Sequence, residues 1–309
     1  MIIDAHNHVD WFGYTPEKLI ENMNRYHIDV TWLLTWEAST DEFDRDRYIK
    51  TFKPGQIGMP FTSVADAVSK YPARFIPGYC PDPRKPDALD RLRAAVEYYG
   101  VKVCGELKFR MMCDNIDAVR LYQLCGQYKL PVVVHLDYPI PVGSGNNPRS
   151  DYWYGGGLDA FERTLRSCPD TVFIGHASGF WAHISKDNKH LKIKRPKGAV
   201  IPDGDLIRIL REYPNLYADL SAKSAHNALS RDLEFSQDFL LEFQDKLLFA
   251  RDDFTDKLQK LLEEFSLPES VMEKIYSKNA LRLVPGVYSP CSLPNIFSGM
   301  LSQHPDLSG

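Results

Sequence analysis

The sequence has few cysteines, and none of the patterns that would give them a structural role. Its six cysteines are scattered, with no CxxC pair and no dense framework, which argues against a thiolate zinc motif and a disulfide-stapled scaffold. No apolar run approaches the roughly 18 residues of a membrane-spanning helix, and the chain opens directly on a predicted strand instead of a signal peptide. We therefore expect a soluble, cytoplasmic protein with no membrane partner.

The chain also lacks an excess of basic residues. It has 37 Lys and Arg against 41 Asp and Glu, a formal net charge of −4, so it offers no positive field to attract nucleic acid. Low-complexity segments and internal repeats are absent as well. The basic run at residues 192–197 is interpreted as part of a solvated loop, with an anion site as the alternative. We expect a small-molecule substrate and no nucleic-acid partner.

What the sequence does contain is a regular alternation of short apolar runs with amphipathic helical stretches, which is typical of a parallel sheet built from βα units. Eight such units predict an α/β fold of the (β/α)8 TIM-barrel kind, which ordinarily takes roughly 250 residues. We predict a single domain over residues 1–284 and a short Ser/Pro/Gly-rich C-terminal tail over residues 285–309. Long helical regions are expected at 225–244 and 255–283. The strands are expected at residues 2–9, 30–36, 75–80, 103–109, 131–137, 171–176, 216–221 and 247–252.

Local signals mark where several helices begin or end. Thr15, followed by a proline, predicts a capped helix start, and Asn115 predicts another. Gly100 is placed to end the helix that precedes it. Either Thr62 or Ser63 is expected to cap the helix that follows the second strand.

The first strand carries a pair of closely spaced histidines. His6 and His8 lie two residues apart, and because side chains alternate along a strand, both should face the same side with α-carbons roughly 7 Å apart. Two imidazoles placed in this way can converge on a single cation. Asp4 is expected on the same face, as an outer hydrogen-bond partner that holds a histidine in one tautomer.

Further polar residues fall at the ends of other predicted strands, where the active site of a barrel is built. These residues are Glu106 and Lys108 on the fourth strand, His135 and Asp137 on the fifth, His176 on the sixth and Asp252 on the eighth. Each has a structural alternative, as a core histidine, a Glu–Lys pair or a helix cap. Because buried ionised groups must be paired or coordinated, a shared metal accounts for the whole set better than separate explanations do.

With these residues the sequence resembles the amidohydrolase superfamily, specifically the amidohydrolase-2 or aminocarboxymuconate-semialdehyde-decarboxylase-like family. The resemblance spans residues 1–284. The sequence departs from the family's pattern on strand eight, where the family usually has Gly-Ser/Thr-Asp and this chain has Ala-Arg-Asp at residues 250–252. The segments that carry the resemblance are Ile3-Asp4-Ala5-His6-Asn7-His8, Val132-Val133-Val134-His135, Ile174-Gly175-His176-Ala177-Ser178-Gly179, Leu248-Phe249-Ala250-Arg251-Asp252 and Asn279-Ala280-Leu281-Arg282-Leu283.

The resemblance implies a metal centre with the four ligands His6, His8, His135 and Asp252. In the decarboxylase-like relatives the histidine that matches His176 positions or activates water instead of ligating. Glu106, however, resembles the bridging carboxylate of two-metal relatives, in which His135 and His176 would bind a second ion. The nitrogen and oxygen ligands suit zinc, as one or two ions, with manganese, iron or cobalt as alternatives. A homodimer is a further expectation from the family.

The leading hypothesis is a metal-dependent hydrolase that uses metal-activated water on a small amide, lactone or ester carrying a carboxylate. Asp252 would pass the water proton to the leaving group, and Lys108 would bind the substrate carboxylate or the oxyanion unless it pairs with Glu106 or Asp137. The alternative is a metal-dependent non-oxidative decarboxylase of an unsaturated or aromatic acid, with Asp252 or His176 handling the proton. A metal-stabilised binding protein without turnover is a third interpretation.

Overall fold

Eight parallel strands form the centre of the molecule. The computed structural model describes residues 1–40, 42–43, 48–137 and 153–286. In this part of the chain each strand pairs in parallel with the next one in sequence, within a sheet of three strands and a sheet of five. The strands are β1 (Ile3–Asn7), β2 (Val30–Leu33), β3 (Phe75–Pro77), β4 (Cys104–Leu107), β5 (Val132–His135), β6 (Phe173–His176), β7 (Leu216–Asp219) and β8 (Leu247–Leu248).

Backbone contacts join the two sheets into a closed barrel. On one side, Gly78 and Val103 form a parallel bridge between the chain after β3 and the chain before β4. On the other side, the Ala5 N–H donates to Phe249 O at 2.9 Å, which joins β1 to the chain after β8. A closed barrel leaves no unpaired sheet edge. The predicted TIM barrel is therefore confirmed.

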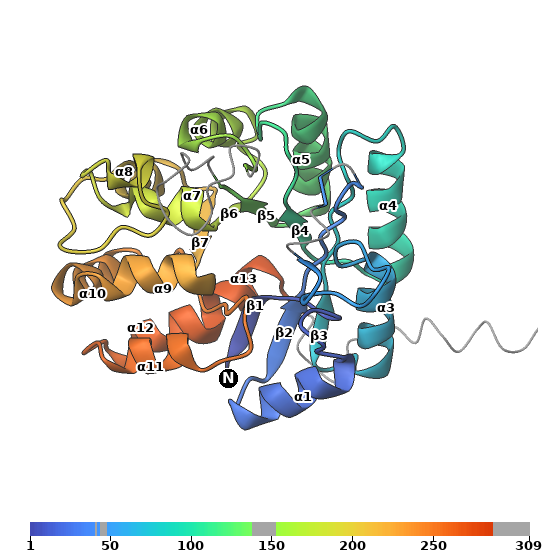
Figure 1. Cartoon of the computed structure of the whole chain (residues 1–309), viewed down its shortest axis with the longest axis horizontal. Helices are drawn as coiled ribbons and strands as arrows, with labels where there is room; N and C mark the ends of the chain where they lie inside the picture. Colours follow the sequence, from blue (N-terminus) through green and yellow to red (C-terminus); the bar gives the residue numbers. More distant parts are fainter. Residues whose placement is uncertain (41, 44–47, 138–152, 287–309) are drawn as a thin grey trace, which may run out of the picture.

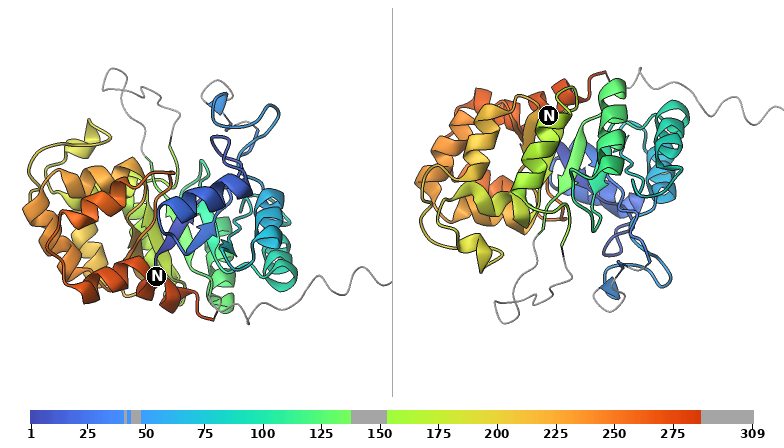
Figure 2. Two further views of the ribbon diagram at one scale, coloured as in Figure 1. Left: turned by 90° about the horizontal axis from the view of Figure 1, so that it is seen from below. Right: turned by 90° about the horizontal axis from the view of Figure 1, so that it is seen from above.

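Helices surround this barrel on all sides (Figure 1). The N-terminus and the last helix lie at one end of it, and the segment between β2 and α3 projects from the other end (Figure 2). No helix among the described residues is both long and apolar enough to cross a membrane. The helices are α1 (Pro16–Arg25), α3 (Phe61–Lys70), α4 (Ala88–Tyr99), α5 (Ile116–Tyr128), α6 (Leu158–Ser167), α7 (Ser178–Trp181), α8 (Asp205–Glu212), α9 (Ala222–Ser230), α10 (Leu233–Glu242), α11 (Lys257–Glu263), α12 (Glu269–Glu273) and α13 (Asn279–Leu283).

Most of the expected helix boundaries are confirmed. Thr15 caps α1 and Asn115 caps α5 through their side chains, and Gly100 ends α4 in the left-handed conformation that glycine adopts without strain. The expected cap at Thr62 or Ser63 is wrong, because α3 already begins at Phe61 and Pro60 is its N-cap residue.

The two long helical regions are each interrupted. Asp232 breaks the first, because its side chain accepts a hydrogen bond from the Phe235 N–H and starts α10 as a separate helix. Pro268 breaks the second, since it lacks an N–H and serves as the N-cap residue of α12. The predicted tail begins at the end of the described residues, so its organisation stays a prediction.

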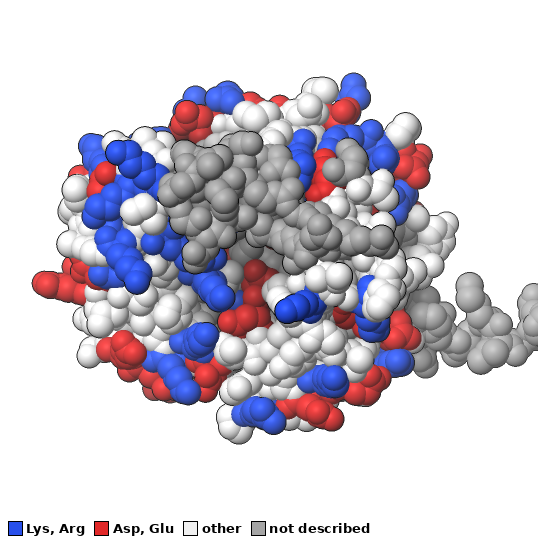
Figure 3. Space-filling view, viewed as in Figure 1, with Lys and Arg blue, Asp and Glu red and all other residues white. Residues whose placement is uncertain are grey.

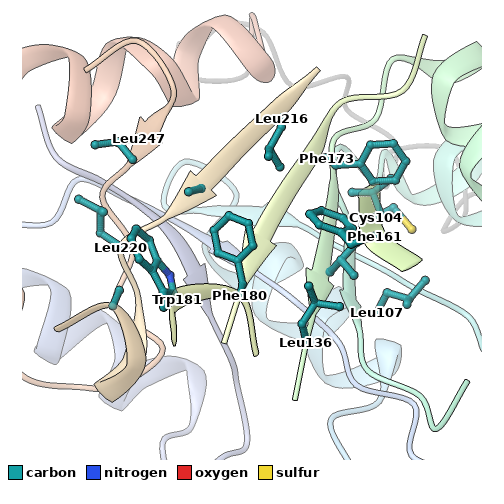
Figure 4. Packing of buried hydrophobic residues seen from close by; sticks show 14 of the residues in the cluster. Cys104, Leu107, Leu136, Phe161, Phe173, Phe180, Trp181, Leu216, Leu220 and Leu247 are labelled. Atoms are coloured by element: carbon teal, nitrogen blue, oxygen red, sulfur yellow. The ribbon is translucent and has the colours of Figure 1, made fainter. Parts of the chain in front are cut away.

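The hydrophobic core has two layers, one outside and one inside the barrel. In the outer layer Phe173, Phe180 and Trp181 pack between the strands and the helices (Figure 4). Each such buried side chain contributes about 1.5–3 kcal/mol. A Cβ atom on Gly175 would lie 2.3 Å from the Phe180 ring, so only glycine lets β6 approach this ring.

The inner layer fills the barrel. It contains Trp32 and Leu34 from the second strand and the segment just after it, together with Ile174 from β6. Ala280 of α13 and Val284 just after it belong to the same cluster. The C-terminal helix therefore packs against the interior, as the floor of the barrel. The polar site described below lies above this layer, toward the carboxyl ends of the strands.

Candidate active site

His6 and His8 reach the centre of the barrel from β1. Both are buried, and the pairing of β1 with β2 shifts register between Asp4 and Asn7. His8 Nδ1 lies 2.9 Å from the Leu34 carbonyl oxygen, so this nitrogen must donate and the Nε2 atom is left for other partners. His6 Nε2 is buried with no hydrogen-bond partner among the described residues.

Among the described residues the Asp4 carboxylate bonds neither imidazole ring, and from the two histidines it accepts only a 3.4 Å hydrogen bond from the His6 backbone N–H. The prediction that Asp4 fixes the tautomer of a histidine is therefore wrong. The Asp4 carboxylate instead accepts hydrogen bonds from Arg251, at 2.9 Å from the backbone N–H and 2.8 Å from Nε. The register shift in β1 explains the error, because strict alternation along the strand is lost after Asp4.

Glu106 occupies the middle of the site. Its Oε1 atom contacts His135 Nδ1 and lies 3.5 Å from His176 Nε2, while its Oε2 atom lies 3.7 Å from His8 Nε2. Burial alone would raise the pKa of this carboxyl group, but Lys108, His135 and His176 hold the pKa well below its usual range. Glu106 is therefore a buried anion among three imidazoles.

His135 lies between two carboxylates. While Nδ1 contacts Glu106, Nε2 lies 3.1 Å from Asp137 Oδ2. Asp137 also forms an ion pair with Lys194 at 2.9 Å, which with His135 lowers the pKa of Asp137 against the effect of burial. The interpretation of the 192–197 run as a merely solvated loop is thus wrong at Lys194, whose side chain is only 20% exposed.

His176, at the end of β6, has a partner that the sequence analysis missed. Its Nδ1 atom lies 3.0 Å from Asp219 Oδ1 and 2.8 Å from the Ser221 hydroxyl. Asp219 also contacts His6 Nδ1, at 2.7 Å from Oδ2. Asp219 ends β7, and the rule that selected the other residues at strand ends would have found it.

Asp252 completes the cluster from the chain after β8. Its carboxylate oxygens lie 3.4 Å from His8 Nε2 and 3.7 Å from His176 Nε2. Burial would raise its pKa, but the hydrogen bond from His8 and the charges of the neighbouring histidines lower it. The alternative role as a helix cap is wrong, because α11 begins five residues later, with Asp256 as its N-cap residue.

Lys108 is half-buried beside Glu106, among aromatic rings. Its Nζ atom is 4.6 Å from the centre of the Trp36 ring and 5.7 Å from that of Tyr154. Its charge also contributes to lowering the pKa of Glu106. Near the centre of the face seen in Figure 3, acidic side chains form a group with basic side chains around it.

The candidate ligands lie close together and their atoms suit a metal ion, but among the described residues His135 forms a group only with Glu106 and His176, not with His6, His8 and Asp252 as the four-ligand set requires. Three overlapping groups have candidate ligand atoms within 4.8 Å of one another. All of these atoms are imidazole nitrogens or carboxylate oxygens, which suit zinc and manganese. The buried, unpartnered His6 Nε2 also fits a ligand whose partner is a cation. The groups are His6–His8–Glu106, His6–His176–Asp252 and Glu106–His135–His176.

A parallel barrel with a histidine–carboxylate cluster at the carboxyl ends of its strands defines a class of metal-dependent barrel enzymes. Within this class the chain belongs to the amidohydrolase-2 family, whose model, described as Amidohydrolase, matches residues 3–286. The resemblance inferred from the sequence is thus confirmed. No curated protein matches the chain.

Solved structures share the fold at low sequence identity. A 2,6-dihydroxybenzoate decarboxylase from Rhizobium superposes with a TM-score of 0.58 and 16% identity, over 92% of this chain and 98% of that one. A dihydroxybenzoic acid decarboxylase from a Polaromonas species, with bound manganese and the inhibitor 2-nitroresorcinol, gives 0.56 and 18% identity, over 87% and 85%. An amidohydrolase from Burkholderia multivorans with bound zinc gives 0.60 and 13% identity, over 92% and 99%.

Proposed function

We propose that this protein hydrolyses a small amide, lactone or ester that carries a carboxylate, using water activated at the histidine–carboxylate cluster. The observation that carries the proposal is the position of Glu106. It belongs to two of the three candidate ligand groups, one with His6 and His8 and the other with His135 and His176. Its Oε2 atom faces His8, whereas its Oε1 atom faces His135 and His176. A carboxylate with its two oxygens directed to different ligand groups is suited to bridge two ions, which favours attack by water.

The residues that would hold the metal follow from the same contacts. His6 and His8 form a group with Glu106, and Asp252 lies 3.4 Å from His8 Nε2, so His6, His8 and Asp252 would bind one ion. Glu106 would bridge to a second ion held by His135 and His176, with which it forms another group. Both ring nitrogens of His135 contact a carboxylate, Nδ1 that of Glu106 and Nε2 that of Asp137. To bind the second ion, one of these nitrogens would have to leave its carboxylate and contact the cation instead. When bound, zinc acidifies water to a pKa of about 7 and polarises a carbonyl group.

Asp252 and Lys108 carry the remaining steps. The Asp252 side chain is 17% exposed, whereas that of Glu106 is only 2% exposed. Asp252 is therefore the carboxylate better placed to take a proton from the attacking water and deliver it to the leaving group. Lys108, half-buried beside the Trp36 ring, would bind the substrate carboxylate or the developing oxyanion.

Non-oxidative decarboxylation of an unsaturated or aromatic acid is the second candidate. It is favoured by the position of His176, whose Nε2 atom lies 3.5 Å from Glu106 and 3.7 Å from Asp252 and could exchange a proton with substrate carbon. The fold similarity to decarboxylases of dihydroxybenzoic acids is compatible with it. In this case a single ion would suffice, and Glu106 would be a counter-charge for the histidines.

Metal content per chain separates the two candidates. We expect about two ions in the wild-type protein and about one in Glu106→Gln, because the amide cannot bridge two cations as a carboxylate does. The matched control is Glu97→Gln, an exposed glutamate that bonds Tyr128 far from the cluster along α4. One ion in both proteins would contradict the two-ion hydrolase, and carbon dioxide release from an acid panel would then establish the lyase.

A further inference from the structure

One buried carboxylate contacts two histidines of the cluster at once. Asp219, fully buried at the end of β7, places Oδ2 2.7 Å from His6 Nδ1 and Oδ1 3.0 Å from His176 Nδ1. The two imidazoles come from β1 and β6, and their ring centres are 4.3 Å apart. Asp219 therefore links a histidine of β1 to a histidine of β6 through their Nδ1 atoms.

The chemistry of a carboxylate determines where the protons lie. An ionised carboxylate only accepts hydrogen bonds, so each nitrogen that contacts it must carry a proton. His6 and His176 are then both protonated at Nδ1, and when the rings are neutral the Nε2 atom of each keeps its lone pair. These Nε2 atoms are the ones that face the candidate metal site, with that of His176 near Glu106 and Asp252.

Ser221 holds the carboxylate in this orientation. Its hydroxyl lies 2.7 Å from Asp219 Oδ1 and 2.8 Å from His176 Nδ1. Because His176 Nδ1 already donates, the single hydroxyl proton is directed to Asp219. Asp219 Oδ1 also accepts a longer hydrogen bond, 3.4 Å, from the Ser221 backbone N–H.

We propose that Asp219 is a positioning residue that fixes His6 and His176 in the same tautomer, so that both present an unprotonated Nε2 to the metal site. The inference rests on the proposed function in one respect only, because that function makes the two Nε2 atoms metal ligands. Carboxylate partners of this kind fix the tautomer and orientation of ligating histidines. Here one carboxylate serves two histidines, so a single change should disturb both.

Replacement of Asp219 by asparagine provides a sharp test. The amide has the same shape but offers one acceptor oxygen and one donor NH₂ group. It can keep the Nδ1–H of only one histidine, and the other must accept at Nδ1 and carry its proton at Nε2. That histidine then loses the lone pair that faces the site. Ser221→Ala removes only the supporting hydroxyl and leaves the carboxylate in place.

The first measurement is ¹⁵N NMR of histidine-labelled, metal-free protein at pH 8, above the ordinary histidine pKa of about 6.5. His6→Gln and His176→Gln identify the two sets of signals. We expect both histidines in the Nδ1–H tautomer in the wild-type chain, and one of them in the Nε2–H tautomer in Asp219→Asn. The control is Asp137→Asn, because Asp137 contacts His135 and should leave the two tautomers unchanged.

The second measurement is the affinity for zinc ions, by competition with a chromophoric chelator. Asp219→Asn should bind zinc about 10- to 100-fold more weakly than wild type, and Ser221→Ala should change the affinity far less. An Nε2–H tautomer for His6 or His176 in the wild-type protein would overturn the proposal, even if the variant fails to fold. So would unchanged tautomers and zinc affinity in Asp219→Asn. Because no substrate is used, neither result depends on the reaction proposed above.

Discussion

Asp4 and Arg251 form a buried ion pair that fastens the start of the barrel to its end. The Arg251 Nε atom lies 2.8 Å from Asp4 Oδ2, and the side chains are 1% and 0% exposed. Arg251 also donates from Nη1 to Asn22 on α1. Arg251, one of the two residues that depart from the family's pattern on strand eight, therefore has a structural role in closing the barrel.

Removing the arginine should destabilise the fold strongly. Arg251→Met leaves Asp4 as an unpaired buried charge, which costs about 3–5 kcal/mol of unfolding free energy. Urea denaturation measures this loss. The matched control is Arg93→Met, whose partner Asp90 is 82% exposed, and which should cost less than about 1 kcal/mol. Equal losses in the two variants would contradict a special contribution from the buried pair.

Asp252→Asn should separate catalysis from metal binding. The amide keeps the size of the side chain but cannot accept a proton, so turnover should fall by about 10²- to 10⁴-fold. We expect most of the metal to remain, because His6 and His8 are unchanged. Steady-state rates and elemental analysis on the same sample check both parts. Full activity in the variant would remove Asp252 from the proton-transfer step.

Metal removal should lower the thermal stability. The cluster brings several buried carboxylates and imidazoles together, and a cation bound only to the folded chain stabilises it by mass action. Free zinc at 100 times its Kd should add about 2.7 kcal/mol. Differential scanning calorimetry with and without a chelator measures the change in Tm. The His6→Gln protein should gain less from zinc, and an equal gain would mean that zinc binds elsewhere.

Glu162 should contribute to the stability at neutral pH and lose this contribution in acid. Hydrogen bonds from Arg208, Arg166 and Tyr213 lower its pKa from an ordinary 4.5 to about 2. Because the folded pKa lies below the unfolded one, the stabilisation is complete above about pH 4.5 and is lost as the pH falls toward 2.

The matching variant is Glu162→Gln. It should be less stable than wild type by about 1–3 kcal/mol at pH 6, and this difference should shrink as the pH approaches 2.5. Urea denaturation at several pH values measures the difference. A difference that stays constant with pH would mean that the charge of Glu162 does not contribute.

The sequence could predict those features of the site that depend on a single strand, such as the end of the barrel at which a side chain lies. His135 and His176 each follow a short β-branched or apolar run, and the carboxyl end of such a run fixes which rim the side chain reaches. The contacts between these residues depend on how neighbouring strands are staggered. That stagger was not deducible, so the placement of His135 between Glu106 and Asp137 appears only in the structure.

Ion pairs between residues far apart in the chain could not be predicted from the sequence either. Asp4 and Arg251 are 247 positions apart, and nothing near either residue indicates the other. Strand ends were overestimated for a related reason. The β8 strand ends at Leu248, although the apolar run continues through Phe249 and Ala250, because the backbone there turns toward β1 and donates from Asp252 to the His6 carbonyl.

The floor of the barrel has a consequence for how the chain is made. Ala280 and Val284, which pack against the barrel interior, leave the ribosome after nearly every other part of the domain, whereas Trp32 leaves it early. Until the last strand and this final turn emerge, the inner face of β1 to β3 has no permanent cover. Apolar surface that stays uncovered in this way makes a partly folded chain prone to aggregation.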